Sequence, residues 1–185
     1  MKLLIFLVPS IFFLSGCALA PKVVHLGPLP PVSEAKFSKP VCIVVSEFKD
    51  QRKEPQILGY TYNLGVKTSD VKTFANVPEW LRTSYVNELK KAGAVECSSK
   101  TEKIVVSAAV KEVTQDESWN INTSVKIDLT VASGTSVLTK SFEGTSSQIS
   151  HAASEGEFTE SLYKAVQYLM KKSVPTIVAT TDEEK

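Results

Sequence analysis

Histidine is scarce in this 185-residue chain, which has two, His25 and His151. Neither lies near another histidine or a cluster of cysteines in the sequence. Metal centres gather several such ligands, and histidine-dependent hydrolases need a nucleophile and an orienting acid beside the base. Paired carboxylates can work without histidine, but the neighbours Asp116 and Glu117 read as an ordinary polar turn before a strand. The sequence therefore predicts no catalytic residue, no metal site and no cofactor.

An excess of charge of either sign is also absent, since 21 Lys and Arg stand against 20 Asp and Glu, for a net charge of +1. Proteins that bind nucleic acid carry a basic excess or a basic stripe that neutralises phosphates. The sequence contains no glycine-rich phosphate-binding loop either. These absences argue against nucleic acid as a partner and against an enzyme.

A sustained apolar run stands at the start of the chain. Met1-Lys2 forms a short positive start, and the run from Leu3 to Leu14, broken by Pro9-Ser10, precedes small residues. The run is shorter than the ~20 residues that span a bilayer, which disfavours an uncleaved membrane helix. This pattern is typical of a secretory signal. We expect residues 1–16 to be removed as a signal peptide.

The stretch Leu14-Ser15-Gly16-Cys17 resembles the lipobox of bacterial lipoproteins. The resemblance implies cleavage before Cys17, a diacylglycerol group on its sulfur and acylation of its new amino group with a fatty acid such as palmitate. Two or three acyl chains hold a protein stably on a membrane, at ~0.8 kcal/mol per buried CH₂. Because Ala18 rather than Asp follows Cys17, the resemblance implies anchoring in the outer membrane. We expect the domain to face the periplasm, with the cell surface as the alternative.

Cysteine is scarce as well, at three residues, and a lipidated Cys17 leaves Cys42 and Cys97. Export would place these two in an oxidising compartment. A strand-helix-strand path could bring them side by side, and a disulfide that closes a loop of this length stabilises by at most about 4 kcal/mol. The alternative is two buried thiols that act as small apolar residues. The sequence leaves both alternatives open.

Residues 17–40 carry no sustained apolar period but several prolines, namely Pro21, Pro28, Pro30, Pro31 and Pro40. Proline-rich chain favours extended geometry at ~3.1 Å per residue, so we expect a lipidated tether that holds the domain away from the membrane. Val23, Val24 and Leu26 offer the alternative of folding back onto the domain. Residues 41–185 are long enough for one hydrophobic core, and we expect a single periplasmic domain there.

Apolar patterning predicts strands over 41–48, 57–62, 66–73, 104–113, 119–131 and 137–144, and helices that begin near Asn76 and Ser154. The continuous β-branched run at 41–48 predicts a central strand covered on both faces. Ser146–Ser154 reads as a polar loop, and Pro175 as an end or kink of the second helix. This order of elements predicts an α+β fold with two helices on one face of a largely antiparallel, mixed sheet.

Two pairs of side chains are candidate partner-binding residues. Asp50 and Arg52 stand one residue apart after the first strand, where they could form a polar recognition corner. We favour the alternative that Asp50 accepts from turn N–H groups and Arg52 pairs with a neighbouring carboxylate. The predicted strands 57–62 and 66–73 would form a hairpin, and Tyr60 and Tyr62 share one face of its first strand. If exposed they would form a docking patch, but we favour the alternative that they close over a core.

Five short segments of the chain together form a recognisable set. They are the lipobox, His25-Leu26-Gly27-Pro28, Asp50-Gln51-Arg52, the hairpin turn Asn63-Leu64-Gly65, and Ser141-Phe142-Glu143-Gly144 ahead of an amphipathic helix. This set resembles the YajG-like family of bacterial outer-membrane lipoproteins. Cys42 and Cys97 are not marks of that family. The resemblance implies an outer-membrane location and no established enzyme activity, and it transfers no functional residue.

The sequence favours a noncatalytic lipoprotein that presents a binding domain to an envelope assembly partner. Such a partner could be a cell-wall synthase, a secretion or surface-appendage apparatus, or another outer-membrane protein. An auxiliary component of lipid or lipopolysaccharide transport is the alternative. That role would need an apolar groove, for which the helical stripes at Leu81 and Leu162 are candidates. A structural envelope lipoprotein is a third alternative, and the sequence identifies neither the partner nor the oligomeric state.

Overall fold

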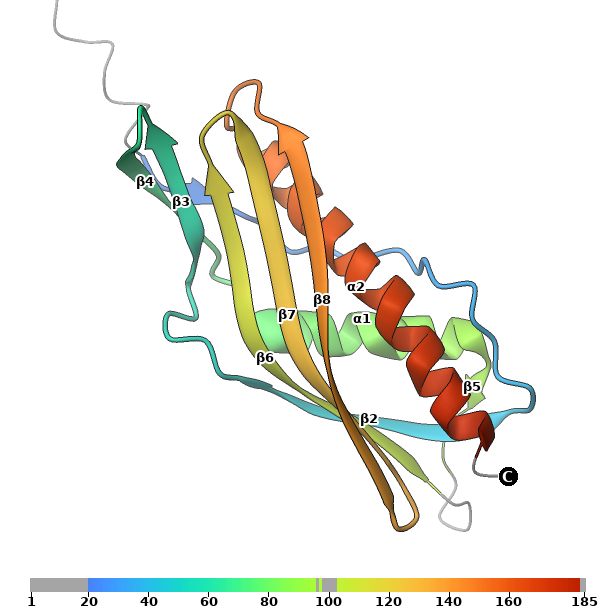
Figure 1. Ribbon diagram of the computed structural model, residues 1–185. Helices are drawn as coiled ribbons and strands as arrows, with labels where there is room; N and C mark the ends of the chain where they lie inside the picture. Colours follow the sequence, from blue (N-terminus) through green and yellow to red (C-terminus); the bar gives the residue numbers. More distant parts are fainter. Residues whose placement is uncertain (1–19, 96, 98–102, 184–185) are drawn as a thin grey trace, which may run out of the picture.

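The computed structural model describes residues 20–95, 97 and 103–183, so the predicted signal peptide and Cys17 lie outside the described residues. The strands are β1 (Lys22–Val23), β2 (Val41–Asp50), β3 (Ile57–Asn63), β4 (Val66–Lys72), β5 (Ala94–Val95), β6 (Ile104–Glu117), β7 (Asn120–Ser133) and β8 (Ser136–Ile149). The helices are α1 (Val77–Ala92) and α2 (Glu155–Glu183). Figure 1 shows both helices on one side of the sheet.

The sheet is built around β6, which has two different neighbours on one edge. β7 and β8 form an antiparallel meander with β6 on the other edge. The shared edge is occupied by β2, which pairs parallel to the first part of β6, and by β3, which pairs parallel to its last residues. β4 closes the β3 hairpin, β1 adds to β4, and β5 adds to β2. The predicted α+β fold with a mixed sheet is confirmed.

β2 lies nearer the sheet edge than its β-branched sequence predicts. Its neighbours are β6 and the two-residue β5. Val41 and Phe48 are buried, whereas Val44 is 36% exposed. The prediction of a central strand covered on both faces is therefore wrong. The cause is that α1 covers one face of β2, where the Phe48 ring packs 5.3 Å from the Tyr85 ring, while the other face stays open.

The two helices begin as the sequence predicts. The Asn76 side chain accepts from the Glu79 N–H, and Gly93 ends α1 in the left-handed region at φ 106°. At the start of α2, Glu157 accepts from the Ser154 N–H at 2.9 Å while the Ser154 hydroxyl accepts from the Glu157 N–H at 3.3 Å. This is the capping box that the spacing predicts. The N–H groups of Ser154, His151 and Ala152 and the Ser154 hydroxyl all donate to the Glu157 carboxylate, and they lower its pKa to about 2.

α2 and β8 both run further than the sequence predicts. α2 continues through Pro175 to Glu183, because Pro175 is on the exposed side and buried Val174, Ile177 and Val178 hold the last turns against the core. β8 continues to Ile149, so the predicted polar loop at Ser146–Ser154 begins as strand. An edge strand tolerates such hydroxyl-rich sequence, since one face of it meets solvent.

Residues 20–40 pack along the domain and do not project from it as a tether. Val24 and Leu29 are 1% and 4% exposed. Trp80 donates its indole N–H to the Gly27 carbonyl at 2.7 Å, and the Gly27 N–H donates to the Tyr163 hydroxyl at 2.6 Å. The alternative in which Val23, Val24 and Leu26 fold back therefore describes this segment, which we call the strap. Because the strap is fixed on the domain, it limits the distance between the domain and Cys17.

Glu88 holds the middle of the strap. Its side chain is 1% exposed and accepts hydrogen bonds from the backbone N–H groups of Val32 and Ser33, the latter at 3.1 Å. Charge-assisted bonds of this kind are stronger than neutral ones. The carboxylate thus satisfies two backbone donors that the strap buries against α1.

We expect Glu88→Ala to lower the free energy of unfolding by about 2 kcal/mol, because it leaves two buried N–H groups without an acceptor. Urea unfolding followed by circular dichroism measures the change. Hydrogen exchange at Val32 and Ser33 should speed up together. Glu79→Ala is the matched control on the same helix, since Glu79 is an exposed partner of Arg82. Equal loss in both variants would contradict the assignment.

Candidate functional site

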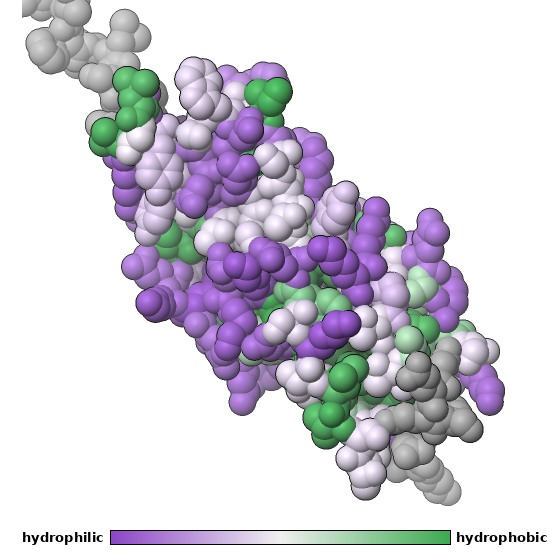
Figure 2. All heavy atoms as spheres, in the orientation of Figure 1, coloured by the Kyte–Doolittle hydropathy of each residue, from purple (hydrophilic) through white to green (hydrophobic). Residues whose placement is uncertain are grey.

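The sheet face opposite the helices is the main polar surface of the domain. Its side chains form cross-strand pairs, with Lys126 lying 2.9 Å from Glu112 and the Thr130 and Thr139 hydroxyls 2.9 Å apart. Figure 2 shows hydrophilic residues over much of this open face. Two adjoining hollows lie on it, and Thr114 and Asp116 line both.

The smaller hollow, of about 360 Å³, lies where β2 leaves the edge of β6 and β3 joins it. We call it the corner site. Three of the four predicted partner-binding residues, Arg52, Tyr60 and Tyr62, line it. The fourth, Asp50, accepts from Arg52 Nε at 2.9 Å and from Arg52 Nη2 at 2.8 Å. The topology of β6 therefore brings together residues that were singled out separately in the sequence.

The guanidinium of Arg52 is fixed in place and incompletely satisfied. Its side chain is 6% exposed, and Asp50 holds it through two parallel hydrogen bonds. This pairing lowers the pKa of Asp50, so the pair stays ionised. Nη1 is buried and has no hydrogen-bond partner among the described residues. The favoured interpretation of a structural ion pair holds for Nε and Nη2, while Nη1 is buried without a partner among the described residues.

Tyr60 and Tyr62 lie on the open side of β3 and are half-buried, so they do not close over the main core. Their ring centroids are 6.5 Å apart in an edge-to-face arrangement. Lys67 Nζ lies 3.7 Å from the centre of the Tyr60 ring, a cation–π contact. The two rings form the aromatic side of the corner site.

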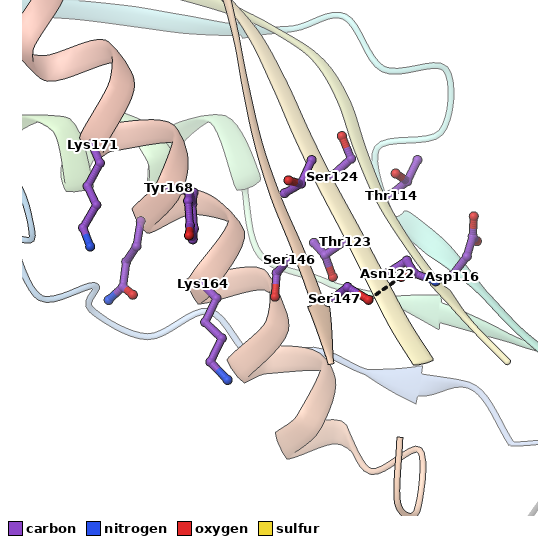
Figure 3. A pocket seen from close by; sticks show the side chains of 12 residues that line it. Thr114, Asp116, Asn122, Thr123, Ser124, Ser146, Ser147, Lys164, Tyr168 and Lys171 are labelled. Atoms are coloured by element: carbon purple, nitrogen blue, oxygen red, sulfur yellow. Dashed lines mark hydrogen bonds between the residues drawn. The ribbon is translucent and has the colours of Figure 1, made fainter. Parts of the chain in front are cut away.

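The larger hollow, of about 710 Å³, was not predicted from the sequence. It lies near the β6–β7 turn, over the end of β6, the start of β7 and the end of β8, and against one side of α2 (Figure 3). Hydroxyl, amide and amine groups line it, among them Ser124, Ser147, Lys164, Tyr168 and Lys171. The one signal in the sequence is the spacing of Lys164, Tyr168 and Lys171, which places three polar side chains on one helix face. Figure 3 shows their side chains across β8 from those of β6 and β7.

Asp116 and Glu117 lie within β6 and not in the polar turn that the sequence predicts. Successive residues of a strand point to opposite faces, so the two carboxylates cannot act on one group. Glu117 is 8% exposed, on the helix side. Asp116 is exposed on the open face, although neighbouring atoms desolvate its carboxyl and raise its pKa against the opposing effect of the Tyr60 N–H.

No apolar groove separates the helices from the sheet in the described part of the chain. Leu81 and Leu162, the stripes that would line it, are both 0% exposed within one core cluster. The Tyr85 hydroxyl and the Ser173 hydroxyl, 2.5 Å apart, join α1 to α2 inside that core. Within residues 20–95, 97 and 103–183, no three His, Cys, Asp or Glu side chains gather as metal ligands, and no helix is long and apolar enough to cross a membrane.

Cys42 and Cys97 form a disulfide in the structure, with their Cα atoms 4.9 Å apart. The strand-helix-strand path explains why they meet. β5 pairs parallel to the start of β2, with Cys42 opposite Val95, so Cys97 follows directly beyond its partner strand. Of the two alternatives that the sequence leaves open, the structure has the disulfide.

Comparisons with known proteins find similar folds and no match in sequence. No protein-family model and no curated protein matches the chain. Its structure is similar to that of protein XCC0632 from Xanthomonas campestris, of the DUF330 family, with a TM-score of 0.62 over 89% of this chain and 99% of that one, at 11% identity. A second solved structure, of an uncharacterized protein, gives a TM-score of 0.53 over 89% and 98% of the two chains, at 10% identity. These likenesses establish the fold alone.

Proposed function

We propose that this protein is a noncatalytic outer-membrane lipoprotein of the YajG-like type, anchored through Cys17, whose domain binds an envelope protein through the corner site. The anchor rests on the lipobox. The binding role rests on one observation, the hollow that Arg52, held in place by Asp50, lines together with two half-buried tyrosines. Arginine and tyrosine are enriched among residues that dominate protein–protein binding energy.

The chemistry of the corner site specifies what a partner should present. Arg52 gives the lining of the hollow a positive charge, so the matching group is a carboxylate or a carbonyl oxygen. The Tyr60 and Tyr62 rings offer apolar area beside it. We infer a partner segment with an oxygen acceptor next to an apolar or aromatic side chain.

We expect Arg52→Lys to reduce recovery of the partner roughly tenfold, because lysine keeps the charge but cannot reproduce the two parallel bonds to Asp50 that hold the guanidinium in place. The measurement is crosslinking in intact envelopes followed by quantitative mass spectrometry of the recovered proteins. Arg82→Lys is the matched control, since Arg82 pairs with Glu79 on α1. Circular dichroism of both variants checks folding.

Two outcomes would count against this proposal. If Arg52→Lys and Arg82→Lys recovered the same proteins in the same amounts, the corner site would not be the binding surface. If repeated experiments recovered no partner at all, the proposed binding role would be wrong. The anchor is tested separately, by incorporation of labelled palmitate and by the mass of the purified N-terminus, which should begin at Cys17.

A further inference from the structure

Exposed apolar side chains gather at one end of the domain. Leu64 is 95% exposed, Val66 67%, Trp119 85% and Ile149 68%. They belong to the β3–β4 turn, the β6–β7 turn and the last residue of β8, which Figure 1 shows at the same end of the molecule. Figure 2 shows apolar residues at this end. We call these four residues the apolar tip.

The strand registers place the apolar tip at one level. Thr61 pairs with both Ser69 and Glu117, so the β3–β4 turn and the β6–β7 turn project beyond the same line across the sheet. Glu117 in turn pairs with Ile121, whose β8 partner is Gln148, the residue before Ile149. The alignment therefore follows from pairing across the whole sheet.

Leu64 occupies a conformation that costs energy and gains no packing. Its φ of 49° lies in the left-handed region, which disfavours residues with a large side chain. Because the side chain is also 95% exposed, no contact within the domain compensates for this cost. A large apolar residue in that position indicates a contact outside the domain.

The strap delivers the chain to the same end. The Ser69 hydroxyl donates to the Ala20 carbonyl at 2.7 Å, and β1 runs parallel to β4 with Lys22 opposite Val71. From Val23 back to Ala20 the strap therefore runs in the direction of Val66 and the β3–β4 turn. Cys17 stands three positions before Ala20 in the sequence, which limits it to about 11 Å from Ala20.

The distance from Ser69 to the apolar tip along β4 is about the same as the greatest distance between Ala20 and Cys17. Val66 lies three residues beyond Ser69 along β4, or about 10 Å at the rise of a strand. An acyl group on Cys17 is therefore within reach of a bilayer surface that lies at the level of Leu64 and Val66. Residues 20–40 do not serve as an extended tether that holds the domain away from that surface, because the strap packs against the domain.

We propose that the apolar tip inserts into the lipid surface beside the anchor, so that the domain stands on this end with its strands rising from the membrane. This inference rests on the lipid anchor of the proposed function. Trp119 is suited to the boundary between headgroups and acyl chains, where tryptophan is enriched in membrane proteins. Leu64, Val66 and Ile149 bury their apolar area in the same layer. The corner site then lies close to the membrane, on the side of the hairpin that carries Tyr60 and Tyr62.

The test attaches the domain to lipid chemically. With Cys42 and Cys97 joined, Cys17 is the remaining thiol of residues 17–185, which contain every described element. Coupling it to maleimide lipid in phosphatidylcholine–phosphatidylglycerol vesicles with brominated acyl chains brings any inserted tryptophan near a quencher. We expect about a twofold loss of the emission of Trp119, taken as the difference between the wild-type chain and Trp119→Phe. The remaining Trp80, which stacks on Tyr163, should keep its emission.

Two matched variants decide whether the tip is responsible. Leu64→Asp should abolish most of the quenching, whereas Val137→Asp, at the exposed start of β8 at the other end of the domain, should leave it unchanged. Unquenched Trp119 on a chain shown to be coupled would overturn the proposal and assign the tip to a protein partner instead. Because coupling is chemical, this result is independent of palmitate labelling, which tests the natural anchor.

Discussion

Replacing both Cys42 and Cys97 by alanine should lower the free energy of unfolding by about 4 kcal/mol. The disulfide closes a loop with a sequence separation of 55 residues, and loop-closure entropy in the unfolded chain gives this value at 25 °C. The loop contains β3, β4 and α1, so the crosslink limits the unfolded chain across a third of the domain. With an m-value of about 2 kcal/mol per M, the urea midpoint should fall by about 2 M.

The control for this result uses reductant. Both chains carry Cys17→Ser, which removes the third thiol and prevents exchange. Adding reductant should move the urea midpoint of the chain with Cys42 and Cys97 to that of the double alanine variant, and should leave the variant itself unchanged. A midpoint that reductant does not move would show that the two cysteines do not stabilise the fold by pairing.

Gly144→Ala should cost about 3 kcal/mol, which corresponds to a fall of about 9 °C in Tm for a domain of this size. A Cβ on Gly144 would lie 2.1 Å from the Ala165 carbonyl oxygen and 2.6 Å from the Leu169 backbone nitrogen. Both are backbone atoms of α2 and cannot rotate away. The close approach of β8 to α2 therefore depends on a residue with no side chain.

Gly156→Ala is the matched control, because the nearest atom to an added Cβ there is 4.0 Å away. Gly156 lies in the first turn of α2, where alanine is the better helix former, so that variant should be as stable as the wild type or slightly more so. Thermal unfolding followed by circular dichroism measures both. Equal Tm values for the two variants would mean that α2 can shift away from β8 at little cost.

The local elements of this fold were predictable because short-range signals specify them. Asn76 and Gly93 define the ends of α1, Ser154 and Glu157 form the capping box of α2, and Asn63-Leu64-Gly65 turns the β3 hairpin. Each of these features depends on residues within a few positions of one another. The alternating residues of β7 likewise predict a strand with one dry face, and Ile121 and Val125 are fully buried.

Long-range pairing decided the features that the sequence left open or misjudged. Proline content predicts an extended segment for the strap, but it does not reveal that Glu88 on α1 supplies acceptors for Val32 and Ser33. The β-branched run of β2 predicts burial, but it does not reveal that β3 takes the rest of the β6 edge.

The sequence by itself determined the capped helices, the hairpin and the likeness to a lipobox, because each is encoded by neighbouring residues. Only the tertiary structure decided that Arg52 shares a hollow with Tyr60 and Tyr62, and that Leu64 lies level with Trp119. Those juxtapositions follow from the register of β3 on β6. Register is set by the burial of whole strand faces against the helices, and that is a property of the assembled core.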